Sequence, residues 1–179
     1  MIIKSFRITK SIEEARREAT RGLLTKLFMG KKLDDITMRT IYIENRIITF
    51  KITPQASVLD RLLRRDTKRK PSMIEMIANG STCGVAYYDR RGVAIDEYDV
   101  PEDEVQLSDF SDEDFIVRGN ALARRILRRR VGGNMLLEVK DIESIYRPYH
   151  VAFFGKPEEG QKVRYIPIAA DGCSVKRTF

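Results

Sequence analysis

Tryptophan is absent from the sequence, and the 179 residues include one histidine, His150, and two cysteines, Cys83 and Cys173. A single imidazole excludes metal sites built from several histidines and any mechanism that requires two of them. The two cysteines lie far apart and each has a glycine neighbour, which is typical of turns rather than of a zinc site. We therefore expect two free thiols and no disulfide framework.

Long hydrophobic runs are also missing. No stretch of about 18 apolar residues occurs, and charges interrupt the strand-like N-terminus, residues 1–7, so we find neither a membrane span nor a signal peptide. These absences predict a cytoplasmic protein with no membrane partner. Because 42% of the residues are hydrophobic, the chain can still bury a core, as one domain or as two small ones.

Nucleotide-binding and metal-binding motifs are absent as well. The sequence has no glycine-rich loop of the P-loop or dinucleotide-binding type, and we interpret Gly30 and Gly132-Gly133 as helix ends. Ten acidic residues lie from Asp96 to Asp114, but their order does not match a calcium-binding loop, and such a run is usually a solvated connector. The sequence therefore predicts no cofactor and no metal ion.

Positive charge is in excess, with a formal net charge of +7. Residues 1–100 hold 20 lysines and arginines against 13 acids, whereas residues 101–179 hold 13 of each. The surplus therefore belongs to the N-terminal part. There, a dense basic cluster consists of Arg61, Arg64, Arg65, Lys68, Arg69 and Lys70.

The most regular segment is 111–133. Ser111 and Asp114 have the spacing of a capping box, which predicts that a helix starts there. Projected at about 100° per residue, the following residues separate into two faces. The apolar face consists of Phe115, Ile116, Leu122, Ala123, Ile126 and Leu127. The opposite side, which we name the arginine face, consists of Arg118, Arg124, Arg125, Arg128 and Arg129. We predict an amphipathic helix over 111–131, with the preceding acids positioned to pair with its arginines.

The N-terminal part contains a second capping box. Residues 3–8 predict a first strand, and the box Ser11–Glu14 predicts a helix that ends at Gly30. Two β-rich runs then flank Glu44-Asn45, which we interpret as the turn of a hairpin. These runs are residues 36–43 and 46–52.

A shorter helix is expected over 56–65, followed after Pro71 by a β-meander with a hairpin turn at Asn79-Gly80. Residues 73–77 are compatible with a strand or with a helical turn. Further strands of the meander are expected at 83–88 and 93–100. The C-terminal strands are expected at 135–139, 149–154, 163–168 and 174–179.

Both halves of the chain share an order of features. A capping box, a helix, a glycine stop, an Ile-Tyr pair and a strand recur at an offset of about 100 residues, which indicates a duplication. The alternative is that any two helix-then-hairpin units share these features. We predict an α+β fold of two helix-plus-antiparallel-sheet units joined by the meander and an acidic linker. The expected domains are 1–100, the linker 101–110, and 111–179.

The C-terminal helix and the segment YHVAFFGKPEEGQKVRYIPIAADGCSVKRTF, residues 149–179, resemble a PepSY-type module, in which a helix packs on an antiparallel sheet. The resemblance covers 111–179. It implies a non-catalytic binding or inhibitory module and supplies no catalytic residues.

Three functional hypotheses follow. The first is a non-enzymatic binding or assembly module that acts through protein contacts, self-association included, because guanidinium groups suit the carboxylates of a partner. The alternative is a nucleic-acid-binding protein that uses the basic cluster 61–70 and residues 118–130, although aromatic residues make up only 8% of the chain. The third is an enzyme with a site around Cys83, His150 and Tyr146.

Overall fold

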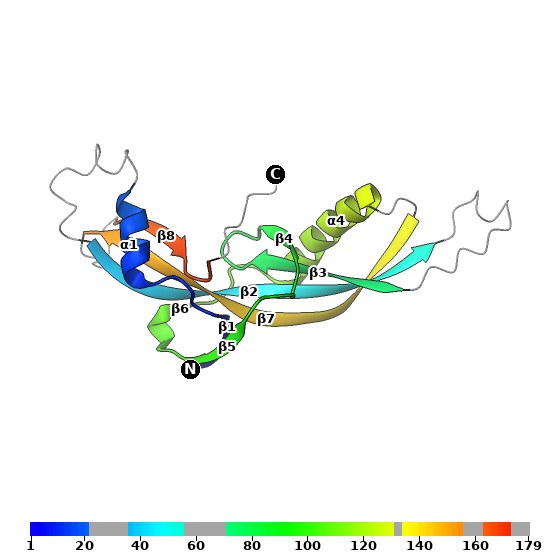
Figure 1. Cartoon of the computed structure of the whole chain (residues 1–179). Helices are drawn as coiled ribbons and strands as arrows, with labels where there is room; N and C mark the ends of the chain where they lie inside the picture. Colours follow the sequence, from blue (N-terminus) through cyan, green and yellow to red (C-terminus); the bar gives the residue numbers. More distant parts are fainter. Residues whose placement is uncertain (22–35, 56–70, 131–133, 156–162, 173–179) are drawn as a thin grey trace. The chain divides into compact units, whose positions relative to one another are not determined.

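The structure, a computed structural model, describes residues 1–21, 36–55, 71–130, 134–155 and 163–172 (Figure 1). Within these residues the chain forms two α-helices, a short 3₁₀ helix (η2) and eight strands. The elements are β1 (Ile2–Phe6), α1 (Ile12–Thr20), β2 (Ile36–Gln55), β3 (Ser72–Asn79), β4 (Val85–Tyr88), β5 (Ile95–Asp99), η2 (Glu102–Glu104), β6 (Val105–Gln106), α4 (Asp112–Arg130), β7 (Asn134–Phe154) and β8 (Arg164–Ala169). Helices combined with a mixed sheet confirm the expected α+β class.

The strands are neighbours in the order β4-β3-β2-β7-β1-β5, with β6 paired to β2 and β8 paired to β7. β3 runs antiparallel to residues 45–52 of β2, and β8 runs antiparallel to residues 149–154 of β7. Each of the two long strands therefore pairs with the next strand in the chain through its C-terminal part.

The hairpin predicted at Glu44-Asn45 is wrong, because residues 36–55 form the single strand β2. Both residues are buried, and their polar side chains have partners there. A carboxylate oxygen of Glu44 accepts a hydrogen bond from the Ser108 backbone at 3.0 Å, and the Asn45 side-chain oxygen accepts one from the Gly80 backbone at 3.3 Å. Residues that usually mark turns thus remain in a strand because distant groups satisfy them.

The prediction of two separate strands, at 135–139 and 149–154, is also wrong, because β7 is one continuous strand from Asn134 to Phe154. One charge in its middle is paired there: Arg147, which is buried, donates from Nε to Asp171 at 2.7 Å. The strand predicted at 163–168 is confirmed as β8. The strand expected at 174–179 lies outside the described residues.

The predicted meander is correct only at its start. Residues 73–77 belong to strand β3, which pairs with β4 across the turn that begins at Asn79. β5, however, pairs antiparallel with the N-terminal strand β1 and not with β4. The acidic stretch that follows β5 contains η2 and the short strand β6, which pairs in parallel with Tyr42 and Ile43 of β2.

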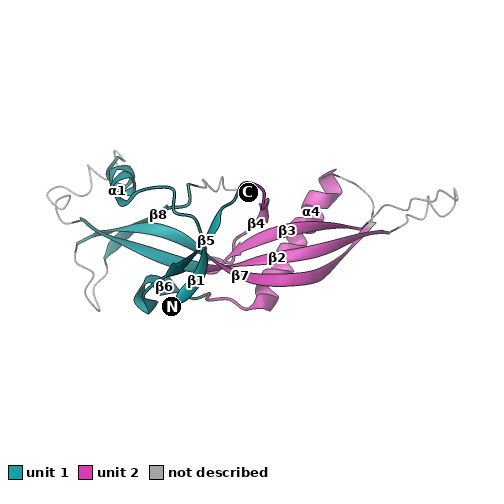
Figure 2. Ribbon diagram, turned by 60° about the horizontal axis from the view of Figure 1, so that its bottom comes forward, with its two compact units in different colours: residues 1–43, 93–107, 146–179 teal, residues 44–92, 108–145 magenta. Residues whose placement is uncertain are grey.

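The chain divides into two compact units, shown in Figure 2. Unit 1 comprises residues 1–43, 93–107 and 146–179, and unit 2 comprises residues 44–92 and 108–145. β2 and β7 each contribute residues to both units. The division into domains 1–100, 101–110 and 111–179 stays a prediction.

Unit 1 contains α1. The predicted capping box is confirmed: the Glu14 backbone donates to Ser11 Oγ at 3.2 Å, and the Ser11 backbone donates to the Glu14 carboxylate at 2.8 Å. Ala15 and Ala19 are the buried residues of the helix. They share a core cluster with Ile36, Ala152, Phe154 and Ile168 of β2, β7 and β8. The expected continuation of this helix to Gly30 lies outside the described residues.

Unit 2 contains α4 and the larger core cluster. This cluster consists of Ile48, Phe50, Ile52, Ile74, Met76, Ala78, Cys83, Phe115, Ala123, Leu127 and Leu137. The core therefore lies between α4 and the strands β2, β3 and β7, and it fixes which side of α4 faces solvent.

Candidate functional site

The start of α4 follows from its capping residues. The Asp114 backbone donates to Ser111 Oγ at 3.3 Å, and the Ser111 backbone donates to the Asp114 carboxylate at 3.2 Å, as the sequence predicts. Asp112 accepts a hydrogen bond from Arg46 Nε of β2 at 2.9 Å. The first turn is thereby attached to the sheet of unit 2.

The inner side of α4 is the stripe Phe115, Gly119, Ala123 and Leu127, all buried and four residues apart. Three of these belong to the predicted apolar face, and its other members, Ile116, Leu122 and Ile126, are half-buried. Gly119 is the residue that sequence reasoning missed. A Cβ atom there would lie 3.2 Å from the Phe50 ring, so its small size permits the close approach of the helix to β2.

The arginine face lies on the outer side as predicted. Arg118, Arg125, Arg128 and Arg129 are exposed, and Arg124 is half-buried. Arg124 Nε donates to Asn120 Oδ1 at 2.7 Å, and Arg118 Nη1 donates to the Cys83 backbone oxygen at 3.4 Å. These two acceptors are uncharged, so neither bond places a negative charge beside the guanidinium group.

None of the five arginines forms an ion pair with a carboxylate among the residues that the structure describes. The expectation that the preceding acids neutralise this face is therefore wrong for the described part of the chain. Two acids of this segment have other partners, because Asp112 pairs with Arg46 and Asp114 accepts hydrogen bonds from Ser111. Farther from the helix, in β5, Asp96 pairs with Arg7 and Asp99 with the terminal amine.

An aromatic side chain accompanies the end of the helix. The guanidinium carbon of Arg130 lies 5.6 Å from the ring centre of Tyr87 in β4, and Tyr87 is 45% exposed. This distance is typical of a cation–π interaction. The two residues are 43 positions apart, so no local pattern in the sequence indicates the contact.

The basic cluster Arg61–Lys70 lies outside the described residues. Its part in a binding surface stays a prediction, and the described candidate site is the arginine face of α4 alone.

The residues proposed for an enzyme site do not come together in one unit. His150 and Tyr146 belong to unit 1, and Cys83 belongs to unit 2. His150 is buried, and both of its ring nitrogens have partners, Thr40 and the Lys10 backbone oxygen. Cys83 is a buried free thiol in the turn between β3 and β4. Both residues thus have structural explanations, and Cys173 lies outside the described residues.

A polar network around the buried carboxylate of Glu44 lies at the start of α4. Glu44 and Arg46 of β2 form an ion pair, and Ser144 of β7 donates to the Glu44 carboxylate. Burial alone would raise the pKa of Glu44, but hydrogen bonds from Ser144, Arg46 and the Ser108 backbone outweigh it and hold the pKa below its usual value. This network fixes α4 against unit 2 and is a structural element.

In the described ranges, no group of three or more His, Cys, Asp or Glu side chains is placed to hold a metal ion. No helix in those ranges is both long and apolar enough to cross a membrane. Comparison of the chain with protein-family models, with curated proteins and with solved structures found no match.

Proposed function

We propose that the chain is a non-enzymatic nucleic-acid-binding protein that contacts the phosphate backbone through the arginine face of α4. The observation that carries the proposal is that these arginines have no carboxylate partner in the described part of the chain. Arginine forms paired N–H···O bonds with phosphate oxygens. Each such contact also releases counterions from the nucleic acid, which favours binding at low salt.

The spacing of three exposed arginines supports this proposal. Arg118, Arg125 and Arg129 are seven and four residues apart in α4, so their side chains leave the helix within about 40° of one another. At about 1.5 Å per residue they extend over about 17 Å of the helix. A row of charges along one side of a helix suits a backbone whose own charges are regularly spaced.

Repulsion between arginines of the arginine face also supports binding of an anionic ligand. Arg124 with Arg128, and Arg125 with Arg129, are like charges four residues apart, and each pair destabilises a helix by about 0.2–0.5 kcal/mol. The dipole at the C-terminal end compensates only the last turn, whereas Arg118 lies in the second turn of α4. A bound polyanion would remove this repulsion.

An acidic protein surface is the second candidate partner, as in the binding or assembly module that the sequence suggests. The observation that favours it is Val117, which is 68% exposed beside Arg118. An exposed apolar side chain among arginines is typical of a protein interface. Self-association through an acidic patch of a second copy belongs to this candidate.

We also infer that the two helix-and-strand segments descend from a duplication. Ser11 precedes α1 and β2, and Ser111 precedes α4 and β7. β2 and β7 have 20 and 21 residues, and each pairs antiparallel with the next strand, β3 or β8. These parallels support the duplication. The PepSY-type character of 111–179, the linker at 101–110 and the cytoplasmic location remain proposals from the sequence.

Fluorescence anisotropy with labelled duplex DNA, single-stranded DNA and RNA tests the nucleic-acid proposal. If all five arginines contact phosphates, the slope of log affinity against log salt on duplex DNA is about −4.5. In a triple variant, Arg118→Gln, Arg125→Gln and Arg129→Gln, we expect a slope of about −1.8, because two contacts remain.

The matched control removes the same charge elsewhere. Arg16, Arg39 and Arg164 are exposed and form no ion pair in the described part of the chain, and their replacement by Gln also lowers the net charge by three. The proposal predicts that this control keeps a slope close to that of the wild type. An equal loss in both triple variants, or no binding at about 50 mM salt, would contradict it. Binding of an acidic protein instead of nucleic acid would favour the second candidate.

A further inference from the structure

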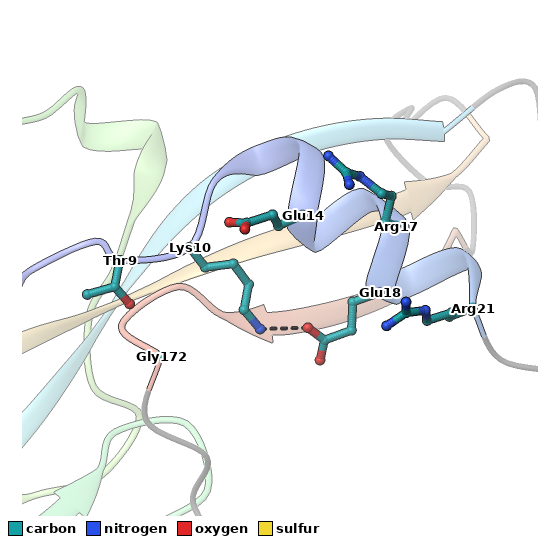
Figure 3. A pocket seen from close by; sticks show the side chains of 7 residues that line it. All are labelled: Thr9, Lys10, Glu14, Arg17, Glu18, Arg21 and Gly172. Carbon is teal, nitrogen blue, oxygen red and sulfur yellow. Dashed lines mark hydrogen bonds and ion pairs between the residues drawn. The ribbon is translucent and has the colours of Figure 1, made fainter.

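Unit 1 contains a pocket of about 480 Å³ beside α1 (Figure 3). Its lining includes three cationic side chains, Lys10, Arg17 and Arg21, and two carboxylates, Glu14 and Glu18. Its volume is within the range of pockets that hold small molecules, roughly 300–1,000 Å³. The pocket belongs to a different unit from the arginine face, so it can be considered as a separate site.

Both carboxylates of the pocket already have partners. Glu14 closes the capping box, because its carboxylate accepts the hydrogen bond from the Ser11 backbone. This bond is the main cause of its lowered pKa, to which the charge of Arg17 adds a smaller part. Glu18 accepts a hydrogen bond from Lys10 Nζ at 2.6 Å, the dashed line in Figure 3. Neither carboxylate therefore needs a cationic ligand.

The two arginines of the pocket, in contrast, lack a carboxylate partner in the described part of the chain. Arg17 and Arg21 are exposed, and neither forms an ion pair with a carboxylate in the described part of the chain. Because they are four residues apart, they lie one turn apart on the same side of the helix. Guanidinium groups donate and cannot accept, so a ligand between them must supply acceptor oxygens and negative charge.

The opposite rim of the pocket is held in place by backbone contacts. The backbone N–H groups of Thr9 and Lys10 both donate to the Ala170 oxygen, at 2.8 and 3.0 Å. Gly172 has φ +70°, and a Cβ atom there would lie 2.6 Å from Thr9 Oγ1. Only glycine fits this close approach without strain. The rim is therefore positioned before any ligand arrives.

We propose that this pocket binds the phosphate group of a small molecule through Arg17 and Arg21. Phosphate presents several acceptor oxygens with up to two negative charges, and two arginines with parallel N–H donors match it. The same chemistry is offered by free phosphate and by the terminal phosphate of a nucleotide. The proposal is independent of the nucleic-acid function of α4.

Isothermal titration of the full chain with three probes tests the proposal. The probes are inorganic phosphate, adenosine 5′-monophosphate and adenosine. We expect at least one of the first two to bind and adenosine not to bind; which of the two binds more tightly identifies the source of the phosphate. Replacement of Arg17 or Arg21 by Gln should weaken binding about tenfold or more, the loss expected for one charge-assisted hydrogen bond.

Two control variants test whether the loss of phosphate binding is specific to the arginines that line the pocket. Arg16→Gln removes an exposed charge from α1 at a position that does not line the pocket, and it should bind like the wild type. The triple variant of α4 should also bind the probes normally while it loses nucleic acid, which separates the two proposals. The pocket proposal is overturned if neither phosphate probe binds up to about 10 mM, if Arg16→Gln weakens binding as much as Arg17→Gln, or if adenosine binds equally well.

Discussion

The Nε2 atom of His150 in β7 lies 2.9 Å from the backbone oxygen of Lys10, in the segment that leads into α1. Because a carbonyl oxygen can only accept, Nε2 carries the proton and donates. The other nitrogen, Nδ1, lies 3.1 Å from Thr40 Oγ1 in β2 and accepts from it when the ring is neutral. One buried imidazole thus connects three segments of unit 1, and Lys10 is also part of the pocket beside α1.

Replacement of His150 by Ala should therefore lower the free energy of unfolding by about 1–3 kcal/mol, since it leaves buried polar groups without partners. Urea denaturation measures this loss. Thr40→Val removes only the bond to Nδ1 and should cost about 1 kcal/mol. A His150→Ala variant as stable as the wild type would show that these hydrogen bonds contribute nothing.

A larger side chain at Gly119 should also lower the stability of the chain. In Gly119→Val the new side chain would press against Phe50 and Ile48, both fully buried, and overpacking of this kind costs about 1–3 kcal/mol. Ala121→Val is the control, because Ala121 is exposed on the same helix and valine there costs helix propensity alone. At position 119 valine has a better helix propensity than glycine, so a loss of stability there must come from packing. Thermal unfolding should separate the two variants clearly; equal melting temperatures would contradict the close packing of α4 on β2.

The lowered pKa of Glu44 should make the free energy of unfolding depend on pH. Its pKa is lower in the folded chain than the ordinary value of 4.5, so the charged form is favoured by folding. This contribution to stability is complete above about pH 5 and is lost as the pH falls through the folded pKa. We expect Glu44→Gln to reduce the difference in unfolding free energy between pH 6 and pH 3.5, measured by urea denaturation at both values. Glu113→Gln, on the exposed side of α4, should leave that difference unchanged.

Two arginines should separate stability from binding. Arg46 is half-buried and pairs with the buried Glu44 and with Asp112, so Arg46→Gln should cost about 1–3 kcal/mol of unfolding free energy because it removes a partner of a buried carboxylate. Arg125 is exposed and has no ion pair in the described ranges, so Arg125→Gln should change stability by no more than about 0.5 kcal/mol. Nucleic-acid affinity should fall for Arg125→Gln. A stable Arg46→Gln variant or a strongly destabilised Arg125→Gln variant would reverse these roles.

The sequence by itself determined the starts of both helices and the two faces of α4. A capping box joins groups only three residues apart, as in Ser11 with Glu14 and Ser111 with Asp114, so local spacing contains the whole interaction. The apolar positions of α4 repeat at the helical period, so burial of one side follows from the pattern alone.

Only the tertiary structure decided how long the strands are and which charges remain unpaired. Glu44 stays in a strand because Ser108 and Ser144, 64 and 100 residues away, bond to its carboxylate. β5 pairs with β1 across the whole N-terminal part, and no local pattern specifies that partner. Asp112, at the start of α4, pairs with Arg46, and Asp96 and Asp99 of β5 pair with Arg7 and the terminal amine, so these acids do not pair with the arginine face. Ion pairs and strand pairing depend on which groups are close in space, and contacts between distant residues set that proximity.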